Sequence, residues 1–442
     1  MYSTSQIKVI FILIDGIGEL SLPQLHNQTI LQSLSLPNYN LIASTGLNGI
    51  MDPVETGLAC GSDTAHMNIF GYNPFTEYRG RGSFETLGSG IPMDLNEIGF
   101  KCNFAYMDPI TKLVHKRRVD REFHKWGMPL IKAIDGIELP GFPGYKSCCV
   151  HATEHRCAIK ITGQNLSSRI TSTDPLKDSL KLKEVVAKND SDEKAVLTAQ
   201  IVNSLSDAIF QSLKEHPLNK QREKEGLLPA NIVLLRGCGS RLKVKSFKEV
   251  QGFNGFMIAP TAIINGIGQS IFLDIVKVKG ATGDYNSNYD AKADGLIENI
   301  RKKEYDFGFL HVKAVDDAGH DKSLDLKQEF YIRVDKMLER IFKGLEEDLD
   351  EYVICLTGDH TTPIKLGDHT FEPVPFAVSS LGAVLIEKGK RKENETKVLR
   401  DLVMKFDEVS CAEGCLGRFS GAEVMGIIRR FKESLGEILG KF

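Results

Sequence analysis

Short apolar runs that end at aspartate or histidine constrain the fold of this chain more than any other feature. Residues 9–14, 232–235, 307–312 and 353–356 form runs of strand length that are apolar nearly throughout. Continuous rather than alternating hydrophobicity indicates strands that are buried on both faces, which is typical of a parallel sheet covered by helices. The sequence therefore predicts an α/β fold with a mostly parallel sheet between helices.

Two longer segments have the periodicity of amphipathic helices. Residues 327–343 and 423–439 repeat apolar side chains at helical spacing, for example Val424, Ile427 and Phe431. The second segment could also be a helix for a membrane surface or a partner. Its polar face mixes Glu with Arg and Lys, so we favour a helix packed on the sheet.

The chain length and a change in composition predict two domains. At 442 residues the chain is too long for one ordinary core. Residues 99–241 contain basic clusters and a Gly-Pro-rich turn at 140–144. We interpret this segment as a smaller inserted α/β domain, and residues 1–98 and 242–442 as a discontinuous core domain.

Charge and cysteine content exclude several classes of partner. A net charge of -3 argues against a nucleic-acid or acidic-membrane partner, since those surfaces select a strong cationic excess. No run approaches the roughly 20 apolar residues of a membrane span, and no secretory signal is recognisable. The nine cysteines lack paired zinc spacing, which favours reduced thiols in a cytoplasmic protein. The oligomeric state has no signal in the sequence.

Three of the apolar runs lead into side chains that could bind metal. We call the following residues the Asp–His cluster: Asp15, Asp316, His320, Asp359, His360 and the nearby His369. A single aspartate after a strand is usually a cap or turn residue, but the carboxyl ends of parallel strands meet at one edge, where ligands collect. Carboxylate and imidazole ligands suit Zn, Mn or a similar ion. Six of them are enough for the two metals of an in-line phosphoryl transfer.

Ser62 is the candidate nucleophile. It follows Gly61 and precedes a helix-compatible run, so its hydroxyl would lie at a helix N-terminus, where negative charge is favoured. Read alone, Ser62 is a plain N-cap, because a serine without an adjacent base is a poor nucleophile. Metal coordination would lower the pKa of the hydroxyl and remove that objection.

Several ordered motifs together resemble the archaeal-type cofactor-independent phosphoglycerate mutases of the alkaline phosphatase superfamily. The match extends over nearly the whole chain and rests on residues 15–18 (DGIG), 61–74 (GSDTAHMNIFGYNP), 80–85 (GRGSFE), 280–283 (GATG), 311–321 (HVKAVDDAGHD) and 357–363 (TGDHTTP).

The resemblance implies a reaction and a division of ligands. The enzyme would interconvert 3-phosphoglycerate and 2-phosphoglycerate through a phosphoserine at Ser62, without bisphosphoglycerate. It would use two divalent ions, with Mn expected and Zn, Co or Mg able to serve. One metal would bind Asp15, Ser62, Asp359 and His360, and the other would bind Asp316, His320 and His369.

Basic side chains are candidates for substrate binding. The segment 116–121 contains Lys116, Arg117, Arg118 and Arg121, and it could equally be an exposed charged loop. Arginine forks match carboxylate and phosphate oxygens. With the resemblance, we predict that the substrate-binding residues are Arg117, Arg118, His155 and Arg156, with Arg236 a weaker candidate.

Two further side chains, Lys313 and His66, each have two possible roles. Lys313 follows a buried strand and could stabilise transferred charge or relay a proton. His66 either packs locally or contacts substrate.

The chain departs from the family pattern at three places. Glu19 stands where an aspartate is usual, Asn73 replaces the aspartate of a Gly-Tyr-Asp-Pro segment, and residues 370–373 (TFEP) replace a Ser-Gly-Asp-Pro. None removes a candidate ligand. A metal-dependent phosphatase, phosphodiesterase or small-molecule kinase-like enzyme of the same superfamily remains an alternative, as does a scaffold whose metals only stabilise the fold.

Overall fold

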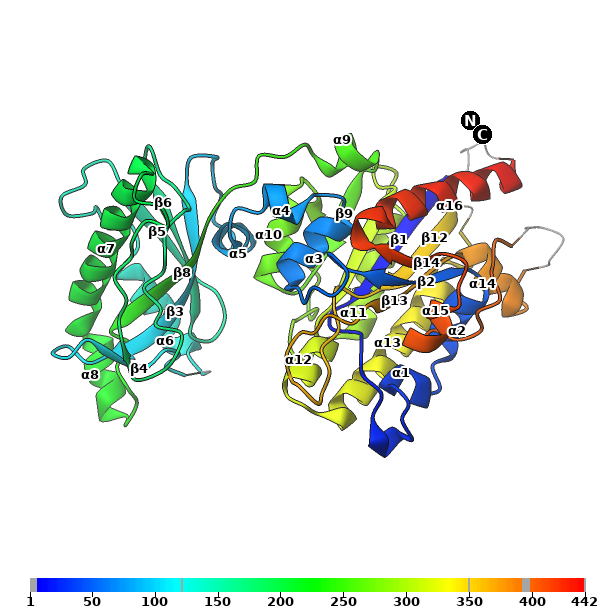
Figure 1. Cartoon of the computed structure of the whole chain (residues 1–442), viewed down its shortest axis with the longest axis horizontal. Coiled ribbons are helices and arrows are strands. Elements are labelled where there is room, and N and C mark those ends of the chain that lie inside the picture. The colour runs from blue at the N-terminus through cyan, green and yellow to red at the C-terminus, as the bar shows by residue number, and fades with distance from the viewer. Residues whose placement is uncertain (1–5, 121, 349, 392–397, 441–442) are drawn as a thin grey trace. The chain divides into compact units, whose positions relative to one another are not determined.

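The computed structural model describes residues 6–440 except 121, 349 and 392–397. The chain divides into two compact units. Unit 1 comprises residues Met1–Thr76 and Lys245–Phe442, and unit 2 comprises Glu77–Val244 (Figure 1).

Unit 1 is built on an eight-stranded sheet. In spatial order the strands are β10 (Asp274–Ile275), β9 (Gly255–Ile258), β11 (Phe307–Val312), β1 (Ile7–Ile14), β12 (Glu351–Thr357), β13 (Val374–Ser380), β2 (Leu47–Asp52) and β14 (Gly417–Ser420). The five strands from β10 to β12 run parallel, β13 is antiparallel to both of its neighbours, and β14 is parallel to β2. The predicted α/β class with a mainly parallel sheet is confirmed.

Helices cover both faces of this sheet, which lies between two helical groups in Figure 1. Every residue of β1, β11 and β12 is buried, as expected of strands covered on both sides. The helices of unit 1 are α1 (Ile30–Ser33), α2 (Pro37–Ser44), α3 (Ser62–Ile69), α9 (Phe247–Gln251), α10 (Ala262–Ser270), α11 (Tyr289–Ile300), α12 (Ala314–His320), α13 (Leu324–Leu345), α14 (Leu381–Glu387), α15 (Glu408–Ala412) and α16 (Val424–Leu439); α4 (Pro74–Glu77) ends at the boundary with unit 2.

The two helices expected from periodicity are present. The segment 327–343 lies within α13, and 423–439 corresponds to α16. Val424, Ile427 and Phe431 of α16 are buried, and α16 contacts β12. The interpretation of this segment as a helix packed on the sheet is confirmed. No helix in the described part of the chain is both long and apolar enough to span a membrane.

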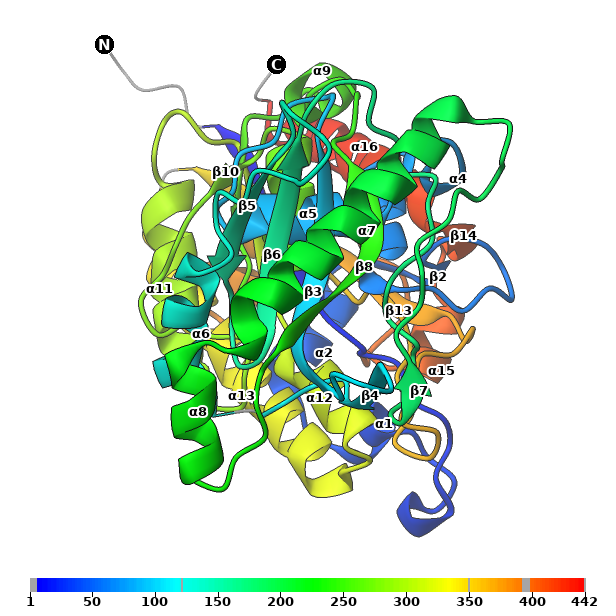
Figure 2. The ribbon, with the colours of Figure 1, turned by 90° about the vertical axis from the view of Figure 1, so that its left-hand side faces the viewer.

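Unit 2 contains a six-stranded antiparallel sheet. Its strands are β3 (Ile98–Met107), β4 (Leu113–Lys116), β5 (Lys146–His151), β6 (Arg156–Thr162), β7 (Leu180–Lys181) and β8 (Ile232–Ser240). Its helices are α5 (Arg81–Gly88), α6 (His124–Lys132), α7 (Glu193–Lys214) and α8 (Pro217–Lys224). The long helix α7 lies across this sheet in Figure 2.

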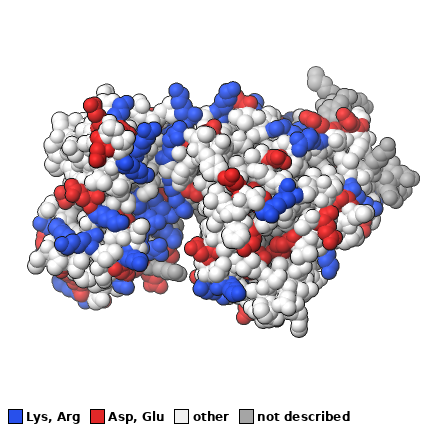
Figure 3. Space-filling view, viewed as in Figure 1, with Lys and Arg blue, Asp and Glu red and all other residues white. Residues whose placement is uncertain are grey.

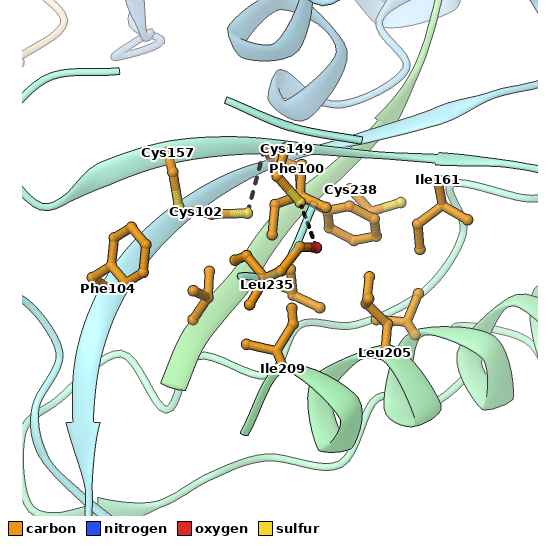
Figure 4. Packing of buried hydrophobic residues seen from close by; sticks show 14 of the residues in the cluster. Phe100, Cys102, Phe104, Cys149, Cys157, Ile161, Leu205, Ile209, Leu235 and Cys238 are labelled. Carbon is orange, nitrogen blue, oxygen red and sulfur yellow. Dashed lines mark hydrogen bonds between the residues drawn. The ribbon is translucent and has the colours of Figure 1, made fainter. Parts of the chain in front are cut away.

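One apolar run belongs to a different sheet from the one predicted. Residues 232–235 form part of β8, which pairs antiparallel with β3 in unit 2 and is not a strand of the parallel sheet. Val233 and Leu235 enter one buried cluster, while Ile232 and Leu234 enter a second. Figure 4 shows Leu235 near Leu205 and Ile209 of α7. Continuous hydrophobicity therefore identified burial on both faces, but it does not define strand direction.

The boundary of the inserted segment also differs from the sequence estimate. Residues 77–98, which we assigned to the core domain, belong to unit 2, and its far end lies at Val244 rather than 241. The physical reason is packing, because α5 contacts β3 and β8. The close contact between α5 and β3 requires glycine at position 82, because a Cβ there would lie 2.1 Å from the Gly99 carbonyl oxygen.

Candidate metal centre

Three adjacent parallel strands bring the Asp–His cluster together at one edge of the sheet. β1 lies between β11 and β12, with Ile14 opposite Val312 and Leu13 opposite Thr357. The chain leaves these three strands at Asp15, at Lys313 and α12, and at Asp359–His360. Segments about 300 residues apart in sequence therefore end at the same place in unit 1.

One group of side chains surrounds His360. Its Nε2 atom lies 3.3 Å from Asp15 Oδ1 and 3.3 Å from Asp359 Oδ2. The Ser62 hydroxyl oxygen lies 3.2 Å from the same Nε2 atom. Ser62 is the first residue of α3, and its N-cap Gly61 has no side chain to cap the helix. The structure thus brings the candidate nucleophile to Asp15, Asp359 and His360.

A second group surrounds Asp316. His320 Nε2 lies 3.3 Å from Asp316 Oδ2, and His369 Nε2 lies 3.4 Å from Asp316 Oδ1. The two imidazoles approach to 3.2 Å between their Nε2 atoms. The rings of His369 and His360 stack with their centroids 3.6 Å apart, so the two groups adjoin. All seven side chains proposed as ligands from sequence lie in these two groups.

The ligand atoms fit divalent cations. Asp15 Oδ1 and Asp359 Oδ2 are buried, and neither has a hydrogen-bond donor in the described part of the chain, although buried polar atoms almost always have one. Each oxygen belongs to a compact three-residue arrangement with His360 that could hold an ion. The arrangements of this kind among the described residues contain no cysteine.

Burial and charge set the protonation of the cluster. Burial lowers the pKa of His360 to about 3, which leaves a neutral imidazole with a free lone pair. Burial raises the pKa of Asp359 well above its usual value, and the charges of Asp15 and Asp316 raise it further. Metal binding would remove that penalty, since it replaces like-charge repulsion with attraction.

Lys313 supplies positive charge between the two groups. Its ammonium lies 3.2 Å from Asp15 Oδ2 and also contacts Asp316 Oδ2. Burial alone would lower the pKa of Lys313, but Asp15 and Asp316 outweigh it and raise the pKa above the usual value. Lys313 is therefore an ammonium at neutral pH, which favours charge stabilisation over proton relay as its role.

Sequence reasoning missed two side chains that contact the cluster. His311 Nε2 lies 3.3 Å from Asp15 Oδ2, and the Thr362 hydroxyl donates to Asp316 Oδ1 at 2.6 Å. The signal for His311 was present, because it is the one ionisable residue in the apolar run 307–312. His66, for which local packing was one alternative, lies 3.6 Å from Asp359 Oδ2.

The predicted substrate-binding residues lie in unit 2. Arg117 makes a bidentate ion pair with buried Asp174, at 2.6 and 2.7 Å, and Arg236 lies 3.4 Å from the same carboxylate. Burial lowers the pKa of Arg118, and the positive charges of Arg236, Arg117 and Arg156 lower it further. These side chains thus form a cationic group, and Figure 3 shows Lys and Arg atoms gathered on one side of unit 2.

His155 and Arg156 extend this group. His155 Nδ1 lies 3.1 Å from the Asp120 carbonyl oxygen, and its buried Nε2 has no partner among the described residues. Arg156 is half-exposed and lies 3.5 Å from Glu154. Lys116 ends β4 nearby in sequence, and Arg121 lies outside the described residues.

Two family models match the chain. Residues 43–219 match the model described as 2,3-bisphosphoglycerate-independent phosphoglycerate mutase. Residues 245–391, which carry most of the Asp–His cluster, match the model described as type I phosphodiesterase / nucleotide pyrophosphatase. The fold and the cluster therefore define an α/β enzyme of the alkaline phosphatase superfamily.

Relatives of similar length specify the family. A 2,3-bisphosphoglycerate-independent phosphoglycerate mutase of Methanocaldococcus jannaschii is 37% identical over 421 residues, which cover 95% of this chain and 96% of the relative. One of Methanopyrus kandleri is 35% identical over 427 residues, covering 96% of each chain. The solved cofactor-independent phosphoglycerate mutase of Thermoplasma acidophilum superimposes with a TM-score of 0.67 at 29% identity, covering 97% of this chain and 100% of that one. The chain belongs to the 2,3-bisphosphoglycerate-independent phosphoglycerate mutase family.

Proposed function

We propose that this protein interconverts 3-phosphoglycerate and 2-phosphoglycerate, with Ser62 as the nucleophile. The observation that carries the proposal is the position of the Ser62 hydroxyl, 3.2 Å from His360 Nε2 within the group that includes Asp15 and Asp359. A serine that served only to begin α3 would need none of these neighbours. The family of the full-length relatives supports the same reaction.

The Asp–His cluster would hold two divalent ions. One would bind Asp15, Ser62, Asp359 and His360, and the other would bind Asp316, His320 and His369. Such ions supply a lowered pKa for the serine hydroxyl and positive charge for phosphoryl oxygens. We expect Mn, and the same oxygen and nitrogen ligands also serve Zn, Co or Mg.

The reaction divides into two balanced transfers. Ser62 Oγ forms a bond to phosphorus while the bond from phosphorus to one glycerate oxygen breaks, which leaves a phosphoserine and a glycerate. The glycerate then reorients, its other hydroxyl oxygen attacks phosphorus, and the bond to Ser62 Oγ breaks. In the first transfer the departing glycerate oxygen takes up the proton that Ser62 gives up, and in the second the attacking glycerate hydroxyl gives its proton to Ser62 Oγ. The phosphoglycerate is thus isomerised without net hydrolysis.

Lys313 would stabilise the transferred group. Its ammonium contacts both Asp15 and Asp316, and its raised pKa keeps it charged throughout the neutral range. A fixed positive charge beside the place where phosphoryl oxygens develop negative charge lowers the barrier without any reorganisation of solvent.

The cationic group of unit 2 would bind the carboxylate of the substrate. Arg118, His155 and Arg156 are the candidates with side chains that are not already in a bidentate ion pair, whereas Arg117 is paired with Asp174. We therefore propose that Arg117 acts by orienting its neighbours in addition to any contact of its own. Guanidinium groups suit this task because they bind carboxylate oxygens bidentately.

We propose the cytoplasm as the location of the enzyme. All nine cysteines are free. This supports a reducing cytoplasm as the location of the enzyme.

The test is an assay of the purified protein with Mn²⁺ and 3-phosphoglycerate, in which 2-phosphoglycerate and inorganic phosphate are both measured. We expect isomerised product, and loss of activity in Ser62→Ala. The matched control is Ser246→Ala, which removes the N-cap serine of α9 and should retain activity. Release of inorganic phosphate in place of product would select the phosphatase alternative, and equal activity in Ser62→Ala would leave Ser62 with only a structural role at the start of α3.

A further inference from the structure

Two buried histidines lie next to the side chains proposed to bind metal. His66 comes from α3 and His311 from β11, and both side chains are fully buried. Their ring centroids are 5.2 Å apart. Phe309 packs against His66 at 5.8 Å between centroids, and Phe70 does so at 6.2 Å. Two imidazoles in an aromatic environment are costly to bury unless they bind something specific.

Each histidine faces an oxygen of the cluster through a different nitrogen. His311 Nε2 lies 3.3 Å from Asp15 Oδ2. His66 Nδ1 lies 2.7 Å from the Ser62 carbonyl oxygen and 3.6 Å from Asp359 Oδ2. Because oxygen atoms only accept, the proton belongs on Nε2 of His311 and on Nδ1 of His66.

In both Asp15 and Asp359, one carboxylate oxygen has donors nearby and the other has no donor among the described residues. Asp15 Oδ2 faces His311 and Lys313, whereas Asp15 Oδ1 faces His360 and has no donor among the described residues. Asp359 Oδ1 accepts from the Gly16 amide at 3.1 Å. Donors on one edge of a carboxylate fix its rotamer and present the lone pairs of the opposite edge.

We propose that His66 and His311 are positioning residues for the metal centre: His311 orients Asp15, and His66 orients Ser62. The inference rests on the proposed function only in that the Asp–His cluster binds divalent ions. Neither histidine is assigned a contact with metal or substrate. Their effect acts through the side chains that do make those contacts.

Amide substitutions distinguish this role from simple packing. The amide nitrogen of asparagine can replace Nδ1 of histidine, and that of glutamine can replace Nε2, since the two side chains differ by one methylene. His311→Gln retains a donor toward Asp15, whereas His311→Asn does not reach it. At position 66 the order is reversed, because His66→Asn retains the donor to the Ser62 carbonyl and His66→Gln does not.

The measurement is Mn²⁺ binding to the metal-stripped full-length protein by isothermal titration calorimetry. We expect His311→Gln and His66→Asn to bind within about threefold of the parent protein. We expect His311→Asn and His66→Gln to lose about 10- to 100-fold in affinity, the usual effect of removing a group that orients a ligand. Far-UV circular dichroism checks that all four variants are folded.

Two results would overturn the inference. Equal affinity in both amides at one position would show that the imidazole only fills space there. Loss of a third bound ion in His66→Gln or His311→Asn would show that His66, His311 and Asp359 themselves bind a cation. Failure of the proposed function would be seen in a different experiment. A protein that released inorganic phosphate in place of 2-phosphoglycerate would fail the activity assay, but the Mn²⁺ affinities of the four variants would still test the roles of His66 and His311.

Discussion

Lys327 of α13 connects the two loops that carry the first group of metal-binding residues, and removing its charge should destabilise unit 1. Its ammonium is fully buried and donates to the Gly18 carbonyl at 2.9 Å, to Glu19 Oε2 at 3.1 Å and to the Thr362 carbonyl at 2.8 Å. Gly18 and Glu19 follow Asp15, and Thr362 follows His360. One side chain thus joins both loops to the helix.

Lys327→Met keeps an unbranched side chain and removes the charge and three donors. Glu19 would then be a buried carboxylate without its counter-ion, and breaking a buried pair in this way costs about 3–5 kcal/mol. Such a loss is a large part of the about 5–15 kcal/mol by which a domain is stable. In Lys327→Met/Glu19→Gln we expect part of the loss to be recovered, because the unpaired charge is gone.

The assay is urea unfolding in EDTA, followed by far-UV circular dichroism. Trp126 is the single tryptophan and lies buried in unit 2, so its fluorescence reports on the other unit. The matched control is Lys336→Met, an exposed lysine of the same helix, which should change stability by less than about 0.5 kcal/mol. A loss below about 1 kcal/mol in Lys327→Met, or no recovery in the double variant, would refute the reasoning.

Three further predictions concern pH, unit 2 and metal. Burial raises the pKa of the partly buried Glu408 from 4.5 to about 7, so the folded state holds this proton more tightly and the free energy of unfolding falls as the pH rises from about 4.5 through 7. In urea titrations Glu408→Gln should remove about 1–3 kcal/mol of that pH dependence, and an unchanged slope of stability against pH would contradict the prediction. Asp174→Asn leaves Arg117 without its buried partner and should destabilise unit 2 by about 2–4 kcal/mol; an unshifted Trp126 fluorescence transition would argue against this. Mn²⁺ at a hundred times its Kd should stabilise unit 1 by about 2.7 kcal/mol in dichroism-monitored unfolding; Asp15→Asn should reduce the gain, and a full gain there would exclude Asp15 as a ligand.

The departure at Glu19 has a structural explanation. Its carboxylate accepts from Lys327 and from the Ile364 amide at 3.1 Å, so the longer side chain serves a buried network beside the cluster and does not enter it. Asn73 caps an exposed turn, where its side-chain oxygen accepts from the Phe75 amide at 2.9 Å. Neither residue is among the proposed ligands.

The strand ends were the most predictable part of the site. An apolar run buried on both faces is recognisable from composition alone, and parallel strands must end at a common edge. Asp15, Asp316 and Asp359 could therefore be grouped from the sequence alone. Their roles as ligands remain predictions until metal binding is measured.

Partners within unit 2 could not be predicted. Residues 116–121 show positive charge, but the sequence does not reveal that Arg117 is paired with Asp174, because the two lie 57 positions apart. The boundary at residue 77 was missed for a related reason. Helix α5 belongs to unit 2 through its contacts with β3 and β8, which composition does not record.

The amino-acid sequence alone determined the α/β class, the buried strands and the residue types that end them, because hydrophobic pattern and ligand chemistry are local properties. The tertiary structure alone decided which run joined which sheet, as β8 shows, and which nitrogen of His66 and His311 faces which oxygen. Those outcomes depend on the packing of segments that are distant in the chain. A contact of about 3 Å between such segments has no signature in the sequence around either residue.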